Sequence, residues 1–145
     1  SGVAKTTIYR HWPTRSALVL DACSKMGTPE PPPDTGTLEG DLLLLARRVA
    51  DQLNNATWPS VLPSIIDAAE RDPEVATLQA SMHAGNMRPF FAAIEQARHR
   101  GDLAPDRDPD LLVAAIVGPL FYRRWFSKEP IDDAVVARVV ARALA

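Results

Sequence analysis

Apolar residues recur along most of the chain at spacings of three and four, as they do in amphipathic helices. One such stripe predicts a helix over residues 38–53, with Asp41, Arg47 and Arg48 on its opposite, charged face; the stripe is Leu38, Leu42, Leu45, Val49 and Leu53. The sequence has no alternating Val, Ile and Thr run and no Asn-Gly or Asp-Gly pair, so nothing predicts strands or hairpins. The pattern therefore predicts an all-α protein.

Prolines and glycines set the boundaries of the other helices. We predict four more helices further along the chain, over residues 58–71, 72–101, 108–127 and 131–144. Asp72-Pro73 and Asp108-Pro109 each combine a capping side chain with a proline in the first turn. The third of these helices is apolar on every side from Leu111 to Tyr122. Pro89 and Pro119 lie inside predicted helices and should bend them.

The first 36 residues predict two short helices and a proline-rich loop. A short helix fits residues 5–11 and stops at Trp12-Pro13, and a second helix over residues 15–25 can be capped by Thr14. Gly27 to Gly36 is rich in proline and predicts a loop. We therefore expect a head with its connecting helix (1–27), a Pro-rich loop (28–36) and a body (37–145).

Composition limits the classes of protein that this chain can represent. Its 145 residues are enough for one domain, or for one domain with a small appendage. The single cysteine, Cys23, excludes an internal disulfide and fits a reducing cytoplasm. The longest apolar run, Leu111 to Tyr122, is shorter than the roughly 20 residues of a membrane span, and no export leader precedes it. We expect a cytoplasmic protein without a membrane partner.

Charge is distributed unevenly along the chain. The formal net charge is −2, yet all 18 acidic residues lie from Asp21 onward. The residues before Asp21 carry Lys5, Arg10 and Arg15, with His11 in addition. A basic head on an acidic body predicts that the head binds an anion, because local charge decides this more than the sum.

Residues 2–12 suit the second helix of a helix-turn-helix. Such a helix lies in the major groove of DNA and presents short polar and cationic side chains to bases and phosphates. Gly2-Val3 supplies a turn residue and an apolar anchor, and Ile8 would pack inward. Hydroxyls and cations would point outward from this helix; they belong to Lys5, Thr6, Thr7, Tyr9 and Arg10.

The string Gly-Val-Ala-x-x-Thr-Ile-Tyr-x-His-Trp at residues 2–12, followed by Ala17 and Leu18, resembles the recognition helix of the TetR/AcrR family of bacterial repressors. Near the other end, residues 116–123 (Ile-Val-Gly-Pro-Leu-Phe-Tyr-Arg) with 129–132 (Glu-Pro-Ile-Asp) resemble the ligand and dimerisation domain of one TetR subfamily. The resemblance implies a first helix and most of a second one before Gly2, both absent from this sequence.

The resemblance also implies which residues meet operator double-stranded DNA: Lys5, Thr6, Thr7, Tyr9, Arg10, His11 and Arg15. Arg15 would hold a phosphate together with the free N–H groups that begin its helix. His11 could instead cap a helix. Ile8 and Trp12 are expected in the core.

In this family the helix over residues 72–101 lines a cavity for a small effector. Apolar side chains around a few polar groups suit a largely apolar ligand, and the expected set is Met82, His83, Asn86, Met87, Phe90, Phe121 and Tyr122. Met and Phe at helical spacing are alternatively plain core residues.

The last two helices have more apolar faces than one small domain can cover. Pairing of residues 108–127 and 131–144 with their copies would give the four-helix bundle of the family's homodimer. The expected interface is Leu112, Ile116, Pro119, Val136, Val139 and Val140. The alternative is that these residues pack inside one chain.

Two classes of function remain. The first is a ligand-responsive DNA-binding repressor, and the second is a helical enzyme or carrier with no DNA role. With only three histidines, no catalytic triad, no phosphate loop and no metal-ligand spacing, we expect no catalytic residue, cofactor or metal. This favours the repressor.

Overall fold

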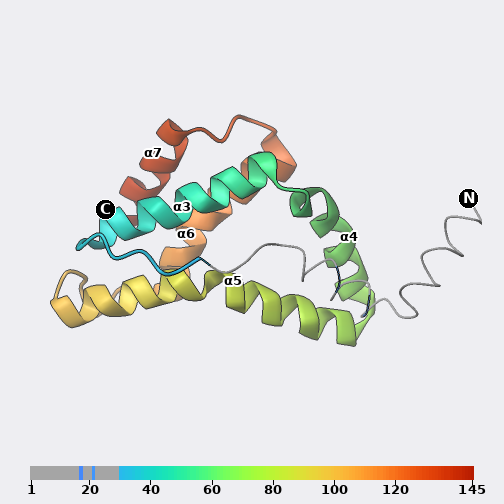
Figure 1. Cartoon of the computed structure of the whole chain (residues 1–145), viewed down its shortest axis with the longest axis horizontal. Helices are drawn as coiled ribbons and strands as arrows, with labels where there is room; N and C mark the ends of the chain where they lie inside the picture. Colours follow the sequence, from blue (N-terminus) through green and yellow to red (C-terminus); the bar gives the residue numbers. More distant parts are fainter. Residues whose placement is uncertain (1–16, 18–20, 22–29) are drawn as a thin grey trace, which may run out of the picture. The chain divides into compact units, whose positions relative to one another are not determined.

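The computed structural model describes residues 30–145, together with Ala17 and Asp21. The part from residue 30 onward is helical without a strand, so the prediction of an all-α chain is confirmed for the described residues (Figure 1). The elements are α3 (Leu38–Asn55), α4 (Trp58–Arg71), α5 (Pro73–Arg100), α6 (Pro109–Tyr122), a short π-helix η1 (Arg123–Ser127) and α7 (Asp133–Leu144). The predicted helices over residues 5–11 and 15–25 lie outside the described residues, apart from Ala17 and Asp21.

Side-chain caps explain where the helices begin. Asp108 accepts hydrogen bonds from the backbone N–H groups of Asp110 and Leu111 at the start of α6. Asp72 accepts from the Glu74 N–H at 3.0 Å, directly before α5. These bonds satisfy donors that have no partner within the helix, so the starts predicted at both aspartates are confirmed.

The prolines inside helices do not interrupt them. α5 continues through Pro89, and the bend predicted there stays a prediction. α6 contains Pro119, and the chain after Tyr122 widens into the π-helical turn η1, whereas we predicted a helix to residue 127 that bends at Pro119. Pro119 donates no hydrogen bond to the Ala115 carbonyl, so the helical ladder already lacks one bond about a turn before η1. Lys128, with φ of 59°, ends the turn.

Backbone contacts divide the chain into two compact units. The larger unit holds Glu30–Ala56 and Met87–Ala145, and the smaller unit includes Thr57–Asn86. The boundary therefore crosses α5 between Asn86 and Met87. The division that we predicted from the Pro-rich loop, with a head to residue 27 and a body from residue 37, stays a prediction.

The core of the larger unit is formed where α3, α6 and α7 pack against one another. The last turns of α5 belong to the same unit and add buried apolar side chains. The fully or almost fully buried members include Leu42, Leu45, Phe90, Ile94, Ile116, Leu120, Val136 and Val140. The stripe predicted for residues 38–53 is thus confirmed for its leucines, while Val49 is only half-buried.

One charged residue contradicts the predicted pattern. Asp41 was placed on the solvent face of its helix, but its side chain is completely buried. It lies in the first turn of α3 and accepts hydrogen bonds from Thr35, in the segment that precedes the helix. A hydrogen-bonded carboxylate is tolerated in such a place because its bonds and the helix dipole offset part of the desolvation cost.

The smaller unit has a core of its own. Ile65 of α4 and Val75 of α5 are buried, with Leu62, Ala68, Ala69 and Leu78 packed around them. Ile66, the neighbour of Ile65 in α4, is exposed. Helical spacing predicts the edge of an apolar stripe only to within about one residue. A residue at that edge can therefore be buried or exposed.

Candidate DNA-binding, ligand and dimer surfaces

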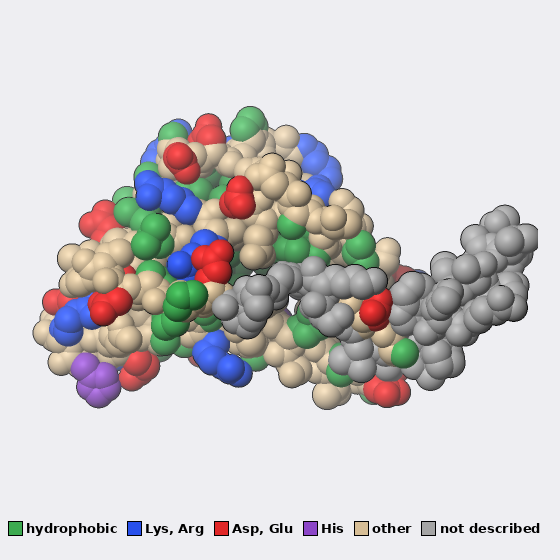
Figure 2. All heavy atoms as spheres, viewed as in Figure 1, with side chains coloured by type: hydrophobic (Ala, Val, Ile, Leu, Met, Phe, Trp, Pro, Cys, Tyr) green, Lys and Arg blue, Asp and Glu red, His purple; other side chains and the backbone are tan. Residues whose placement is uncertain are grey.

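The predicted DNA-contacting residues lie outside the described residues. This applies to the whole set, Lys5, Thr6, Thr7, Tyr9, Arg10, His11 and Arg15. Their roles stay predictions. On the face that Figure 2 shows, Lys and Arg side chains of the described residues are interspersed with Asp and Glu side chains, so this face has no patch of one sign.

The predicted effector residues of α5 differ in burial. Met87 and Phe90 are buried in the larger unit. Met82 is half-buried, and His83 and Asn86 are exposed; these three residues belong to the smaller unit. Two apolar members of the set are therefore core residues of one unit, in line with the alternative interpretation. A cavity that these residues share stays a prediction.

The other two predicted effector residues belong to a row of aromatic side chains around η1. Phe121 is half-buried and meets Trp125 edge to face, with ring centroids 5.2 Å apart and an interplanar angle of 72°. Tyr122 is 59% exposed and stacks on Phe126, with centroids 5.8 Å apart and an interplanar angle of 17°. Such stacking keeps two large rings in a fixed orientation at the surface.

Four of the six predicted dimer residues belong to the core of a single chain. Leu112, Ile116, Val136 and Val140 are all buried where α3, α6 and α7 meet. For these four side chains the structure supports the alternative, packing inside one chain. Pro119 is exposed and Val139 is half-buried. The dimer itself stays a prediction, and its surface has to be sought elsewhere on the same helices.

α6 has a second apolar face, which we call the outer face. Leu111 is 68% exposed there, and Tyr122 lies on the same side three turns later. Every residue of the outer face is apolar and exposed: Leu111, Ala114, Ala115, Gly118, Pro119 and Tyr122. Phe126, which is 75% exposed, extends this face beyond the helix through its stacking on Tyr122.

The apolar character of α6 is visible in the sequence, but which side of the helix is buried and which is exposed is not. A helix with a polar face shows which side meets water, and α6 has no polar face between Leu111 and Tyr122. The residues of the outer face were therefore missed, except for Pro119 and Tyr122. The one available signal was that apolar residues occur on every side.

α7 exposes small side chains beside two cations. Ala134, Ala137 and Ala141 lie along its exposed side. Arg138 and Arg142 flank these alanines and make no ion pair with any other described residue. Small residues allow the backbone of another helix to approach closely.

Comparison with known proteins identifies the family. Residues 32–143 match the family model described as "Tetracyclin repressor-like, C-terminal domain". This match takes in α3, α4, α5, α6 and all but the last residue of α7, and it accounts for most of the chain.

Similar proteins match over almost the whole chain. The HTH-type transcriptional regulator YdeS of Bacillus subtilis is 27% identical, over 97% of this chain and 72% of its own length. The DNA-binding transcriptional repressor TetR of Mycobacteroides abscessus is 31% identical, over 94% of this chain and 73% of its own length. Coverage this high necessarily takes in most of residues 1–29.

A solved structure supports the same assignment. The TetR family transcription regulator SCO0332 superposes with a TM-score of 0.73 at 31% sequence identity, covering 99% of this chain and 80% of that one. In the described part of the chain, none of the helices has the length and apolar character of a membrane span. The family model, the relatives and the structural neighbour agree, and the chain belongs to the TetR family of transcriptional regulators.

Proposed function

We propose that this protein is a repressor that binds operator DNA as a homodimer and is released by a small, largely apolar effector. The observation that carries the proposal is the extent of the matches, which run past the body into the segment with the Gly2-to-Trp12 motif. One of the matched proteins is named a DNA-binding transcriptional repressor. The relatives reported are all transcriptional regulators, which counts against the helical enzyme or carrier.

DNA recognition is assigned to the motif itself. Tyr9 and Arg15 would hold phosphates, and Lys5 or Arg10 would reach base edges in the major groove. The two kinds of contact differ in what they contribute: phosphate contacts act on any DNA, whereas base contacts act only on the operator.

The experiment that tests this assignment uses the chain preceded by its N-terminal helices and DNA from upstream of its own gene. Arg15→Ala should weaken binding to operator and unrelated DNA alike and reduce the slope of log K against log salt by about 0.9. Lys5→Ala or Arg10→Ala should cost ~1–3 kcal/mol on the operator only. Binding by fluorescence anisotropy that is unchanged in all three variants would exclude this surface.

Homodimerisation is assigned to the outer face of α6. This face is apolar throughout, and a monomer would leave Leu111 and Tyr122 in water. Ala115 and Gly118 lie near its middle, and an added Cβ at Gly118 would meet nothing within 4 Å. A second copy could therefore bring its own α6 close to this face, and with the neighbouring α7 of each chain the two copies would form a four-helix bundle.

Release by an effector would act through a population shift. Two heads of a dimer meet successive major grooves only when they are about 34–36 Å apart. An effector that binds better when the heads are at another spacing disfavours the DNA-bound dimer by the ratio of its two affinities. Met82, His83 and Asn86 of the predicted effector set are the residues whose substitution should change the effector affinity. The test is the effector affinity with and without operator, and equal affinities would contradict the mechanism.

A further inference from the structure

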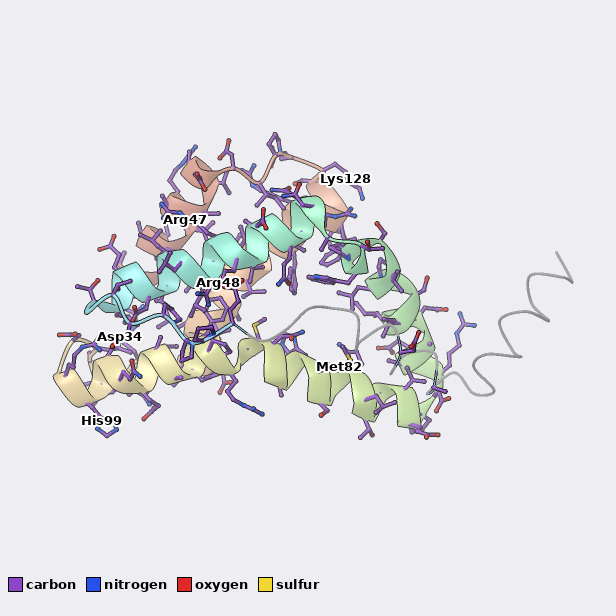
Figure 3. The ribbon with its side chains drawn as sticks, in the orientation of Figure 1. Asp34, Arg47, Arg48, Met82, His99 and Lys128 are labelled. Atoms are coloured by element: carbon purple, nitrogen blue, oxygen red, sulfur yellow. The ribbon has the colours of Figure 1, made fainter. Side chains whose placement is uncertain are left out.

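Residues 30–37, which we call the strap, precede the first turn of α3 in the chain and lie beside that helix. Arg48, which is labelled in Figure 3, extends from α3 and holds the start of the strap. Its Nε lies 2.8 Å from Glu30 Oε2, and its Nη1 donates to the Pro31 carbonyl at 3.2 Å. Pro33 is buried. Three consecutive prolines, residues 31–33, each have a restricted φ, which stiffens this part of the chain.

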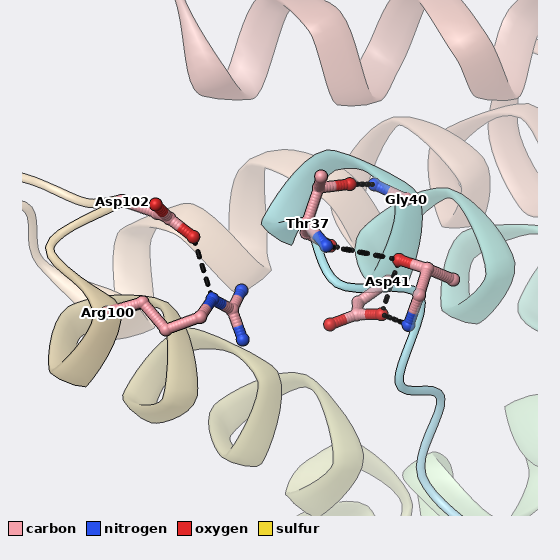
Figure 4. Close-up of polar contacts among 6 residues, drawn as sticks. Thr37, Gly40, Asp41, Arg100 and Asp102 are labelled. Carbon is pink, nitrogen blue, oxygen red and sulfur yellow. Dashed lines mark hydrogen bonds and ion pairs between the residues drawn. The ribbon is translucent and has the colours of Figure 1, made fainter.

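Asp41 holds the other end of the strap. Its Oδ1 accepts hydrogen bonds from the backbone N–H and from the hydroxyl of Thr35, both at 2.8 Å (Figure 4). Its Oδ2 is buried and has no partner in the part of the chain that the structure describes. A buried carboxylate with one oxygen unpaired is costly, and a leucine would fill this space without that cost. The contact with the strap is therefore what the carboxylate contributes.

Gly40 has no side chain, and the contact between Thr35 and Asp41 needs that space. An ideal Cβ on Gly40 would lie 2.4 Å from Thr35 Oγ1 and 2.9 Å from Thr37 Oγ1. The Thr35 hydroxyl donates a hydrogen bond to Asp41. The Thr37 hydroxyl caps α3, because its oxygen accepts from the Gly40 N–H at 3.1 Å. A side chain at position 40 would have to displace Thr35, Thr37 or both. The helix thus carries its glycine where the strap approaches most closely.

The strap lies at a decisive place in the chain. The larger unit begins at Glu30, and the residues before it, 1–29, carry the predicted DNA-contacting set. Arg48 therefore binds the first two residues of the larger unit, Glu30 and Pro31. α3, on which the strap is fixed, packs directly against α6 and α7, the helices assigned to the dimer.

We propose that the strap is a positioning element that fixes the point from which each DNA-binding head extends, with Asp41 and Arg48 as its positioning residues. The proposal rests on the proposed function. A released strap would let each head sample more orientations within the dimer. The second head would then reach its half-site at a lower effective concentration, while the contacts of a single head with DNA would not change.

The test uses the chain with its N-terminal helices and compares substitutions that add or remove the same atoms in different places. Gly40→Ala should disturb the strap; Gly85→Ala is its control, because a Cβ there meets nothing within 4 Å. Arg48→Met should also release the strap; Arg47→Met is the control on the same helix. Thr35→Val, at an exposed position, removes one bond to Asp41 with little risk to folding.

Two measurements are made on each variant: amide hydrogen exchange of the strap, which reports on residue 30 and residues 34–37 because prolines 31–33 have no amide hydrogen, and affinity for a full operator and for a single half-site. Gly40→Ala, Arg48→Met and Thr35→Val should speed exchange in the strap, by about tenfold in the first two. The first two should weaken full-operator binding by about fivefold or more, the size of a typical coupling between sites, and half-site binding by less than about twofold. Both control variants should behave as the wild type.

Unchanged exchange in the strap of Gly40→Ala and Arg48→Met would show that these contacts do not hold it and would overturn the proposal. Faster exchange with equal losses on full operator and half-site would overturn the positioning role. A wild-type protein that binds neither DNA would overturn the proposed function and this coupling together. That outcome is distinguishable, because failure of the strap alone leaves wild-type binding intact.

Discussion

α3 and α6 both contribute to the same core, but they differ in what they expose. α3 buries its leucines and turns Arg47, Asp51 and other polar side chains to the surface. α6 buries Leu112, Ile116 and Leu120, yet its exposed side carries Leu111 and Tyr122. A polar face shows that this side of a helix meets water. A helix that is apolar on both sides has two packing surfaces, one that packs inside the chain and one that a partner would cover.

The size of the second contact follows from its side chains. Fully burying a large apolar side chain contributes roughly 1.5–3 kcal/mol, and Leu111, Tyr122 and Phe126 all retain most of their surface in the single chain. A face with three such residues and small residues between them is typical of an interface core. Substitutions on each side of α6 and α7 can separate the contacts inside the chain from this outer contact.

The largest effect is expected from Val136→Glu. Val136 is buried against the core, so the substitution places an unpaired charge there and should cost more than about 4 kcal/mol, which leaves the chain unfolded. The neighbouring Ala137→Glu lies on the exposed side of α7 and should fold. Far-ultraviolet circular dichroism during urea titration checks both. A folded, monomeric Val136→Glu would instead return this residue to the dimer interface.

A smaller effect is expected for cavities on the two sides of α6. Ile116→Ala should lower the free energy of unfolding by about 2–5 kcal/mol at any protein concentration, because the cavity lies inside the chain. Leu111→Ala should lower it only as far as it weakens association, so its effect should shrink on dilution. Urea midpoints at several protein concentrations distinguish the two. Identical behaviour would mean that the two faces are not different.

Gly118→Ala should have effects of opposite sign. Alanine replaces glycine in a helix, and nothing lies within 4 Å of the added Cβ, so the single chain should gain about 0.5–1 kcal/mol. In the dimer the same methyl would separate the two helices and raise the dissociation constant. Thermal unfolding at low concentration and sedimentation velocity measure the two effects. A stabilised chain with an unchanged dimer would remove Gly118 from the interface.

The smallest effect is expected on the charged face of α3. Arg47 and Asp133 are 3.8 Å apart and both well exposed, so Arg47→Met should change the free energy of unfolding by less than about 0.5 kcal/mol. A loss above 1 kcal/mol would show that this face is more than a solvated surface.

Much of the fold could be predicted from the sequence because its signals are local. Helical spacing and the caps at Asp72 and Asp108 depend on neighbours in the chain, and these helices formed as expected. The burial of Asp41 depends on Thr35, whose approach is permitted by Gly40, and no spacing rule encodes that encounter. The π-turn after Tyr122 likewise has no pattern of its own.

The candidate sites divide in the same way. The DNA-contacting set comes from a motif whose residues are consecutive, so a family resemblance could identify it. The dimer surface depends on which side of α6 the rest of the chain covers. Leu111 and Leu112 are adjacent and identical in type, and only the packing of α3 and α7 decides that one is exposed and the other buried.

Sedimentation equilibrium of the wild type and of Leu111→Glu decides whether a second copy of this chain covers the outer face of α6. We expect a wild-type dimer at micromolar concentration and a Leu111→Glu variant that is folded but monomeric, because a charge would be buried in the interface. Leu44→Glu, at an exposed leucine on α3, should remain dimeric. A monomeric wild type, or a dimer that survives Leu111→Glu, would show that no second copy covers this face.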